Sequence, residues 1–86
     1  MDANFSTLVM SLGSSTMIAL GQIPDPNTGH ASTDLKVAQF NIDLLQVLKE
    51  KTSGNLTEEE NKFLTALLSD LQTQYLDKKK NATANN

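Results

Sequence analysis

The residues best suited to bind a metal ion are a single histidine, His30, and the aspartates on either side of it, Asp25 and Asp34. A metal site needs several ligands held at a fixed geometry, and the chain contains no cysteine to add to these three. One imidazole in a loop that also contains proline and glycine is more typical of a turn. We therefore expect no metal ion and no other cofactor.

Three consecutive carboxylates, Glu58 to Glu60, could take part in acid–base catalysis, which needs a cleft that keeps one carboxyl group protonated. Thr57 precedes them, and the pair Thr57 and Glu60 has the spacing of a capping box at a helix start. Serines are numerous, but none lies in a nucleophile-elbow pattern, and a single loop histidine does not complete a catalytic triad. The sequence therefore predicts a protein that is not an enzyme.

The composition favours a small protein that associates with itself. The chain has 86 residues, a net charge of −3 and seven basic residues, all of them lysine. Without arginine, an acidic chain is poorly suited to bind nucleic acid. A domain of this size is marginally stable and usually depends on disulfides, metals or partner subunits. The absence of cysteine leaves close packing or self-association, and it is compatible with the reducing cytoplasm, where we place the protein.

Turn and capping residues divide the chain into three predicted helices. The first ends near Gly21, because Pro24 and Pro26 prevent its continuation. The second begins within residues 32–34, where serine, threonine and aspartate can each cap it. It ends before Gly54, which suits the left-handed conformation that follows many helices.

The third helix begins at the capping box and fades between residues 77 and 80. The residues after it are polar, so we predict one helical domain over residues 1–76 and a disordered tail over residues 77–86. The fold class is therefore all-α, with a long uncharged N-terminal helix, a loop and an antiparallel helical hairpin. We expect this three-helix protein to assemble as an oligomeric helix bundle.

The apolar residues of these helices, placed at about 100° per residue, exceed what one copy can cover. The third helix has a single apolar side. The second has two adjacent apolar stripes, one formed by Leu35, Ala38, Ile42 and Leu45, the other by Val37, Phe40, Leu44 and Val47. Because a helix packed on one neighbour needs a single stripe, we expect the second stripe at an interface.

The first helix has no charged residue, and small side chains recur at every fourth position from Thr7 to Ala19. Such a row lets a second backbone approach closely, and its hydroxyls can bond back to carbonyls one turn earlier. The sequence leaves open the alternative that this row faces solvent. We expect a homodimer or a dimer of dimers. The predicted self-association residues are Thr7, Ser11, Ser14, Ser15, Ile18, Ala19, Val37, Phe40, Leu44 and Val47.

The connection between the first two helices is long for a compact bundle and forms a second candidate contact, for an unidentified protein partner. Its tip consists of Asp25, Pro26, Asn27, Thr28, Gly29 and His30.

The alternative to self-association is a peripheral protein whose uncharged first helix lies on a membrane surface, assisted by the lysines at positions 78–80. The same helix is too rich in serine and threonine to be expected to span a bilayer. The chain also begins without the positive residues of a secretory signal.

Three stretches resemble a known family: FSTLVMSLGSSTMIALG, the Pro-Asp-Pro turn that ends at Gly29, and IDLLQVLKEKTSGNLTEEENKFL. The family is a group of short bacterial proteins, the domain-of-unknown-function family numbered eighteen forty-four. The resemblance extends from Phe5 to Leu76 and is most specific between Ile42 and Glu60. It implies a small, all-helical bacterial protein and carries no activity, substrate or catalytic residue with it.

Overall fold

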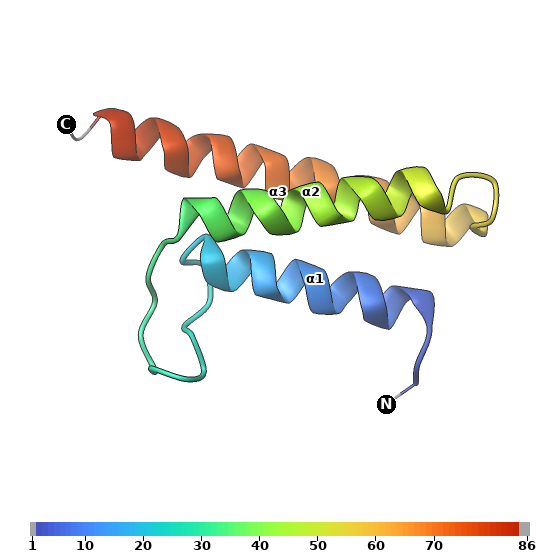
Figure 1. Ribbon diagram of the computed structural model, residues 1–86, viewed down its shortest axis with the longest axis horizontal. Helices are drawn as coiled ribbons and strands as arrows, with labels where there is room; N and C mark the ends of the chain where they lie inside the picture. The colour runs from blue at the N-terminus through green and yellow to red at the C-terminus, as the bar shows by residue number, and fades with distance from the viewer. Residues whose placement is uncertain (1, 85–86) are drawn as a thin grey trace.

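The computed structural model describes residues 2–84, with the side chains of residues 2–81. These residues form three helices, α1 (Phe5–Ala19), α2 (Leu35–Lys51) and α3 (Glu58–Ala84), which confirms the predicted all-α fold. α1 and α2 lie side by side and antiparallel, and α3 returns behind α2 (Figure 1). The molecule measures 44 × 27 × 16 Å and is therefore flat. Each helix contacts both of the others.

The first two helices begin at the side chains that cap them. Asn4 Oδ1 accepts a hydrogen bond from the Thr7 amide at 2.9 Å, and Asp34 Oδ1 accepts one from the Val37 amide at 3.2 Å. Of the three residues predicted to cap α2, Asp34 is therefore the one that does so. α1 ends in a turn that places Gly21 at φ +78°, a conformation that glycine adopts without strain.

α3 begins as predicted but extends further than predicted. The capping box is confirmed, because the Thr57 amide donates to Glu60 Oε1 at 2.9 Å and the Glu60 amide donates to Thr57 Oγ1 at 3.1 Å. The helix continues to Ala84, so the predicted disordered tail over residues 77–86 is helical up to that residue. Residues 85–86 lie outside the described part. The difference arises because lysine and alanine favour helix, and neither glycine nor proline follows Gly54.

The core lies where the three helices meet and consists of aliphatic side chains. Its buried members are Val9, Ala19, Leu20, Ala38, Ile42, Leu45, Leu64, Leu68 and Leu71. α1 approaches α3 closely at Gly13, where an added Cβ would lie 3.0 Å from Leu67 Cδ2. Thr16 is also buried, and its hydroxyl donates to the Leu12 carbonyl at 2.7 Å. The side of α1 that packs inward therefore includes a glycine and a threonine.

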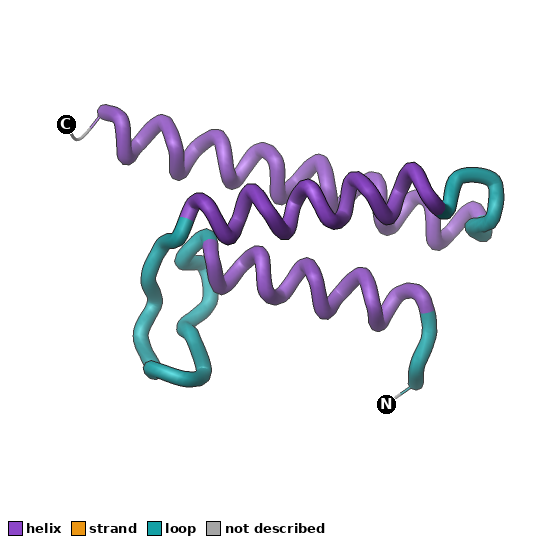
Figure 2. Tube along the Cα trace, in the orientation of Figure 1, coloured by secondary structure: helices purple, strands orange, loops and turns teal. Residues whose placement is uncertain are grey.

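The connection between α1 and α2 forms a closed loop that stands away from the helices (Figure 2). Its two ends are joined, because the Asp34 amide donates to the Ala19 carbonyl at 2.7 Å and Leu20 pairs with Thr33 in an isolated antiparallel bridge. The loop is thus anchored at the shared end of α1 and α2.

Candidate interaction surface

Four apolar side chains of α2 face solvent, and we call them the α2 strip. Its members Val37, Phe40, Leu44 and Val47 are 45%, 61%, 37% and 48% exposed. They are spaced by three, four and three positions, the alternation of a and d positions in a coiled coil. The other predicted stripe of α2 supplies the core residues Ala38, Ile42 and Leu45. One side of α2 is therefore used within the chain, and an adjacent apolar side is not.

The row of hydroxyls on α1 is bonded partly within the helix itself. Thr7 Oγ1 donates to the Asp2 carbonyl at 2.8 Å, and Ser11 Oγ donates to the Thr7 carbonyl at 3.0 Å. The predicted bonding of hydroxyls to carbonyls one turn earlier is thus confirmed for Ser11, and the buried Thr16, which lies outside the row, makes the same kind of bond. A hydroxyl that already has a partner inside the chain can be covered at little cost.

The α1 residues of the predicted interface differ in how far they are exposed. Ser11 and Ser15 are exposed, and Thr7, Ser14 and Ile18 are half-buried. Ala19 is only 7% exposed and belongs to the core, and it also lines the groove between α1, α2 and the loop. Its carbonyl accepts from the Asp34 amide at 2.7 Å, which holds the last turn of α1 against the start of α2.

A groove of about 520 Å³ lies between the outer side of α1, the loop and Val37, the first residue of the α2 strip. α1 contributes Ser15, Ile18 and Ala19 to its lining, and α2 contributes Val37 and Asn41. The loop contributes residues 25–27, Ser32 and Asp34. The structure therefore brings part of the small-residue row and the candidate partner loop together at one end of the second apolar stripe, that of Val37.

The tip of that loop is shaped by its own hydrogen bonds. Asp25 Oδ1 accepts from the Asn27 amide at 2.8 Å, and the Asp25 carbonyl accepts from the Gly29 amide at 2.7 Å. The Asp25 amide donates to the His30 carbonyl at 3.0 Å and closes the turn. Because the Asp25 carboxylate is engaged in an Asx turn, its function in this structure is to shape the loop.

The structure gives two of the three consecutive glutamates a role at the start of α3. Across residues 2–84, no three or more His, Cys, Asp or Glu side chains lie close enough together to hold a metal ion. Glu60 completes the capping box, and the exposed Glu58 carboxylate lies 3.2 Å from the Lys62 ammonium group one turn later. Both acids thus support the start of α3.

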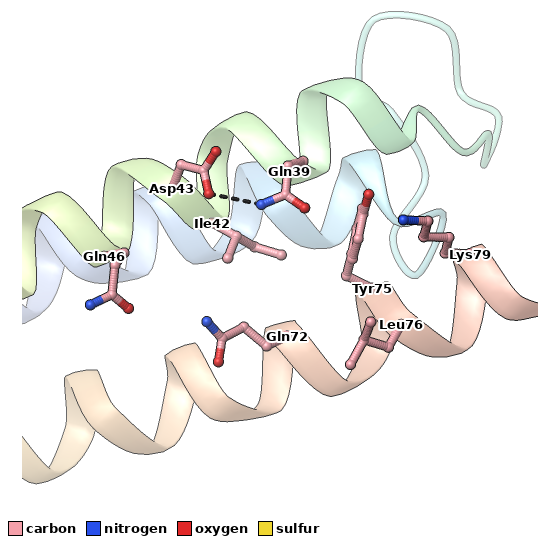
Figure 3. A pocket seen from close by; sticks show the side chains of 8 residues that line it. All are labelled: Gln39, Ile42, Asp43, Gln46, Gln72, Tyr75, Leu76 and Lys79. Carbon is pink, nitrogen blue, oxygen red and sulfur yellow. Dashed lines mark hydrogen bonds between the residues drawn. The ribbon is translucent and has the colours of Figure 1, made fainter.

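A second groove, of about 410 Å³, runs between α2 and α3 and was not predicted as a site. Gln72 and Tyr75 point from α3 towards α2, and Gln39 Nε2 donates to Asp43 Oδ1 at 2.8 Å (Figure 3). The lining residues are Gln39, Ile42, Asp43, Gln46, Gln72, Tyr75, Leu76 and Lys79. The sequence feature that could have indicated this groove is the recurrence of glutamine on α2, at Gln39 and Gln46. Such amides donate and accept hydrogen bonds but supply no nucleophile.

The fold and the surface define a class of protein: a small all-α protein in which one helix completes the core on one side and exposes an apolar strip on another. The domain of unknown function DUF1844 matches residues 2–77, and the chain belongs to this family. This match confirms the resemblance noted in the sequence.

No curated protein and no solved structure matches the chain. Within the described residues, no helix combines the length and the apolarity needed to cross a membrane.

Proposed function

We propose that the protein is a homo-oligomeric helical protein, a dimer or a dimer of dimers, that acts as a structural or accessory subunit in the bacterial cytoplasm without catalysis of its own. The α2 strip is the observation that carries the proposal. Its four side chains follow one another along a single helix face and are 37–61% exposed in the single chain. A continuous apolar surface of this kind is typical of an interface.

The surroundings of the α2 strip support the same conclusion. α1 contributes only small and apolar side chains to the groove beside it and carries no charged residue of its own. The two carboxylates that line this groove, Asp25 and Asp34, belong to the loop and already accept hydrogen bonds from backbone amides. A second copy that covered both the strip and this groove would bury apolar surface that is exposed to solvent in a single flat copy.

The proposal is tested by sedimentation equilibrium of the full chain over low to high micromolar concentration. We expect a mass that approaches at least twice the 9.4 kDa of one chain as the concentration rises. A folded species that stays at the mass of one chain over the whole range would overturn the proposal.

A second candidate function is a peripheral membrane protein, and one observation favours it. Leu8 and Met10 of the uncharged helix α1 are 49% and 43% exposed. Such a helix can lie at a bilayer surface. Flotation with phosphatidylcholine vesicles, with and without phosphatidylserine, separates the two functions. A self-associating protein stays at the bottom of the gradient, whereas a membrane-surface protein floats and its α1 substitution Leu8→Ser reduces the floating fraction.

A further inference from the structure

We propose that two copies pair through the α2 strip in antiparallel orientation, about a two-fold axis that crosses α2 between Phe40 and Leu44. This inference rests on the proposed self-association and specifies its geometry. It follows from the spacing of the strip, from the charges along its edge and from the position of the strip relative to α1 and α3.

The spacing of the strip sets the layers of such a pair. Val37 and Leu44 take a positions, and Phe40 and Val47 take d positions. In an antiparallel pair, a residues face d residues, so Val37 faces Val47 of the second copy and Phe40 faces Leu44. Each layer then combines side chains that differ in size, or two small ones. A parallel pair would instead place Phe40 against Phe40.

The charges along one edge of the strip discriminate more sharply between the two orientations. Lys36, Asp43 and Glu50 recur every seven residues beside the strip, at g positions, and all three are exposed. Antiparallel helices bring g positions opposite g positions, so Lys36 meets Glu50 of the second copy twice. Near the axis, Asp43 meets its own copy and opposes the pairing. The exposed position of Asp43 lets solvent screen that repulsion.

A parallel pair has no such compensation. It brings g positions opposite e positions, which are Asn41 and Leu48. Lys36 would then face an amide, and Asp43 would face a leucine that removes water from the carboxylate. Because edge charges determine orientation in paired helices, they favour the antiparallel pair.

The arrangement of the three helices leaves room for this pairing. Ile42 lines the groove towards α3 and Asn41 lines the groove towards α1, so the strip lies beyond α1 on the side away from α3. A second α2 on the strip would lie beside Ser15 and Ile18, whose side α1 presents to the same groove. A standard interface buries about 800 Å² per partner, more than four side chains supply, so the outer side of α1 must take part.

Cysteine cross-linking of the full chain tests the orientation, because the natural chain has no cysteine. The variants are Val37→Cys and Val47→Cys, treated alone or mixed with a short thiol-reactive cross-linker. In the antiparallel pair, positions 37 and 47 face each other, whereas two copies of either position lie about 15 Å apart along the helix at a rise of 1.5 Å per residue. We therefore expect cross-linked dimers in the mixture and few in either variant alone.

Leu76→Cys is the matched control, because Leu76 is 62% exposed but lies in the other groove, and it should not cross-link. A charge test accompanies it. Lys36→Glu alone and Glu50→Lys alone should each weaken association by roughly threefold to tenfold, and the double exchange should restore it, because both ion pairs reform with opposite polarity.

Each other outcome overturns a distinct claim. If the single variants cross-link as well as the mixture, the pairing is parallel, and the proposed self-association stands without this geometry. If the chain sediments as a dimer but neither variants nor mixture cross-link, the strip is not the dimer contact. If the chain sediments as a monomer, the proposed function fails as well.

Discussion

Replacing Phe40 by alanine should weaken self-association by about two orders of magnitude while leaving the single chain folded. A fully covered aromatic side chain buries roughly 150–250 Å². With 61% of Phe40 exposed in one copy, roughly 120 Å² remains for a partner to cover. At about 25 cal/mol per Å², that area corresponds to ~3 kcal/mol per copy as an upper limit.

Alanine retains part of the contact, and a side chain at an interface is not completely buried. We therefore take half of the upper limit as the loss of association free energy per copy. Two copies then lose about 3 kcal/mol in total, which raises the dissociation constant roughly a hundredfold. The stability of the monomer should change by less than about 0.5 kcal/mol, because the side chain is mostly exposed within one copy. Leu45→Ala, in contrast, opens a cavity in the core and should lower the free energy of unfolding by about 2–5 kcal/mol.

Sedimentation equilibrium of the natural chain, Phe40→Ala and Leu76→Ala measures the effect. Leu76→Ala is the control, because Leu76 has the same exposure on a different face. Circular dichroism of all three checks that the helices remain formed. The reasoning is refuted if Phe40→Ala and Leu76→Ala have the same dissociation constant, since exposure alone would then explain both.

Three further predictions concern other parts of the chain. Ser11→Leu should raise the dissociation constant while the helix content of the monomer stays unchanged, because a large side chain obstructs close approach at an exposed position; an unchanged sedimentation profile would mean that the α1 row is merely surface. Asp43→Asn should strengthen association, because it removes a like-charge contact at the proposed axis, and the gain should shrink in high salt; weaker association would contradict the antiparallel pairing. Thr57→Ala should lower the free energy of urea unfolding by about 1 kcal/mol through loss of the capping box, whereas Thr65→Ala, at an exposed position inside α3, should change it little.

The starts of α2 and α3 and the α2 strip could be predicted from sequence because each depends on local chemistry. Asp34 and the pair Thr57 and Glu60 act on amides within three residues of themselves, so their effect does not depend on the rest of the fold. The α2 strip could be predicted because its apolar residues recur with the period of an α-helix, which requires no knowledge of the other helices. The end of α3 was missed, because a polar run that ends in asparagine resembles a tail although its lysines and alanines favour helix.

The inward side of α1 was harder to predict because an uncharged helix offers no polar face as a reference. Leu8 and Val9 are both large and apolar, yet Val9 is buried and Leu8 is half exposed. Val9 lies one turn before Gly13, the position at which α3 approaches α1 so closely that an added Cβ would lie 3.0 Å from Leu67 Cδ2. That contact joins residues far apart in the chain, so no local pattern contains it.

The α2 strip and the hydroxyl row of α1 can both be buried at a low cost in free energy, but for different physical reasons. The α2 strip is apolar, so covering it releases water from hydrocarbon. The α1 row contains hydroxyls, but those of Thr7 and Ser11 already bond to atoms of the same chain, and a partner that covers them need not replace those bonds. Lysine or glutamate at either position would keep water at the surface and oppose coverage. The absence of charge from α1 and the apolar strip of α2 therefore have one physical effect, which is to make the same side of the molecule easy to dehydrate.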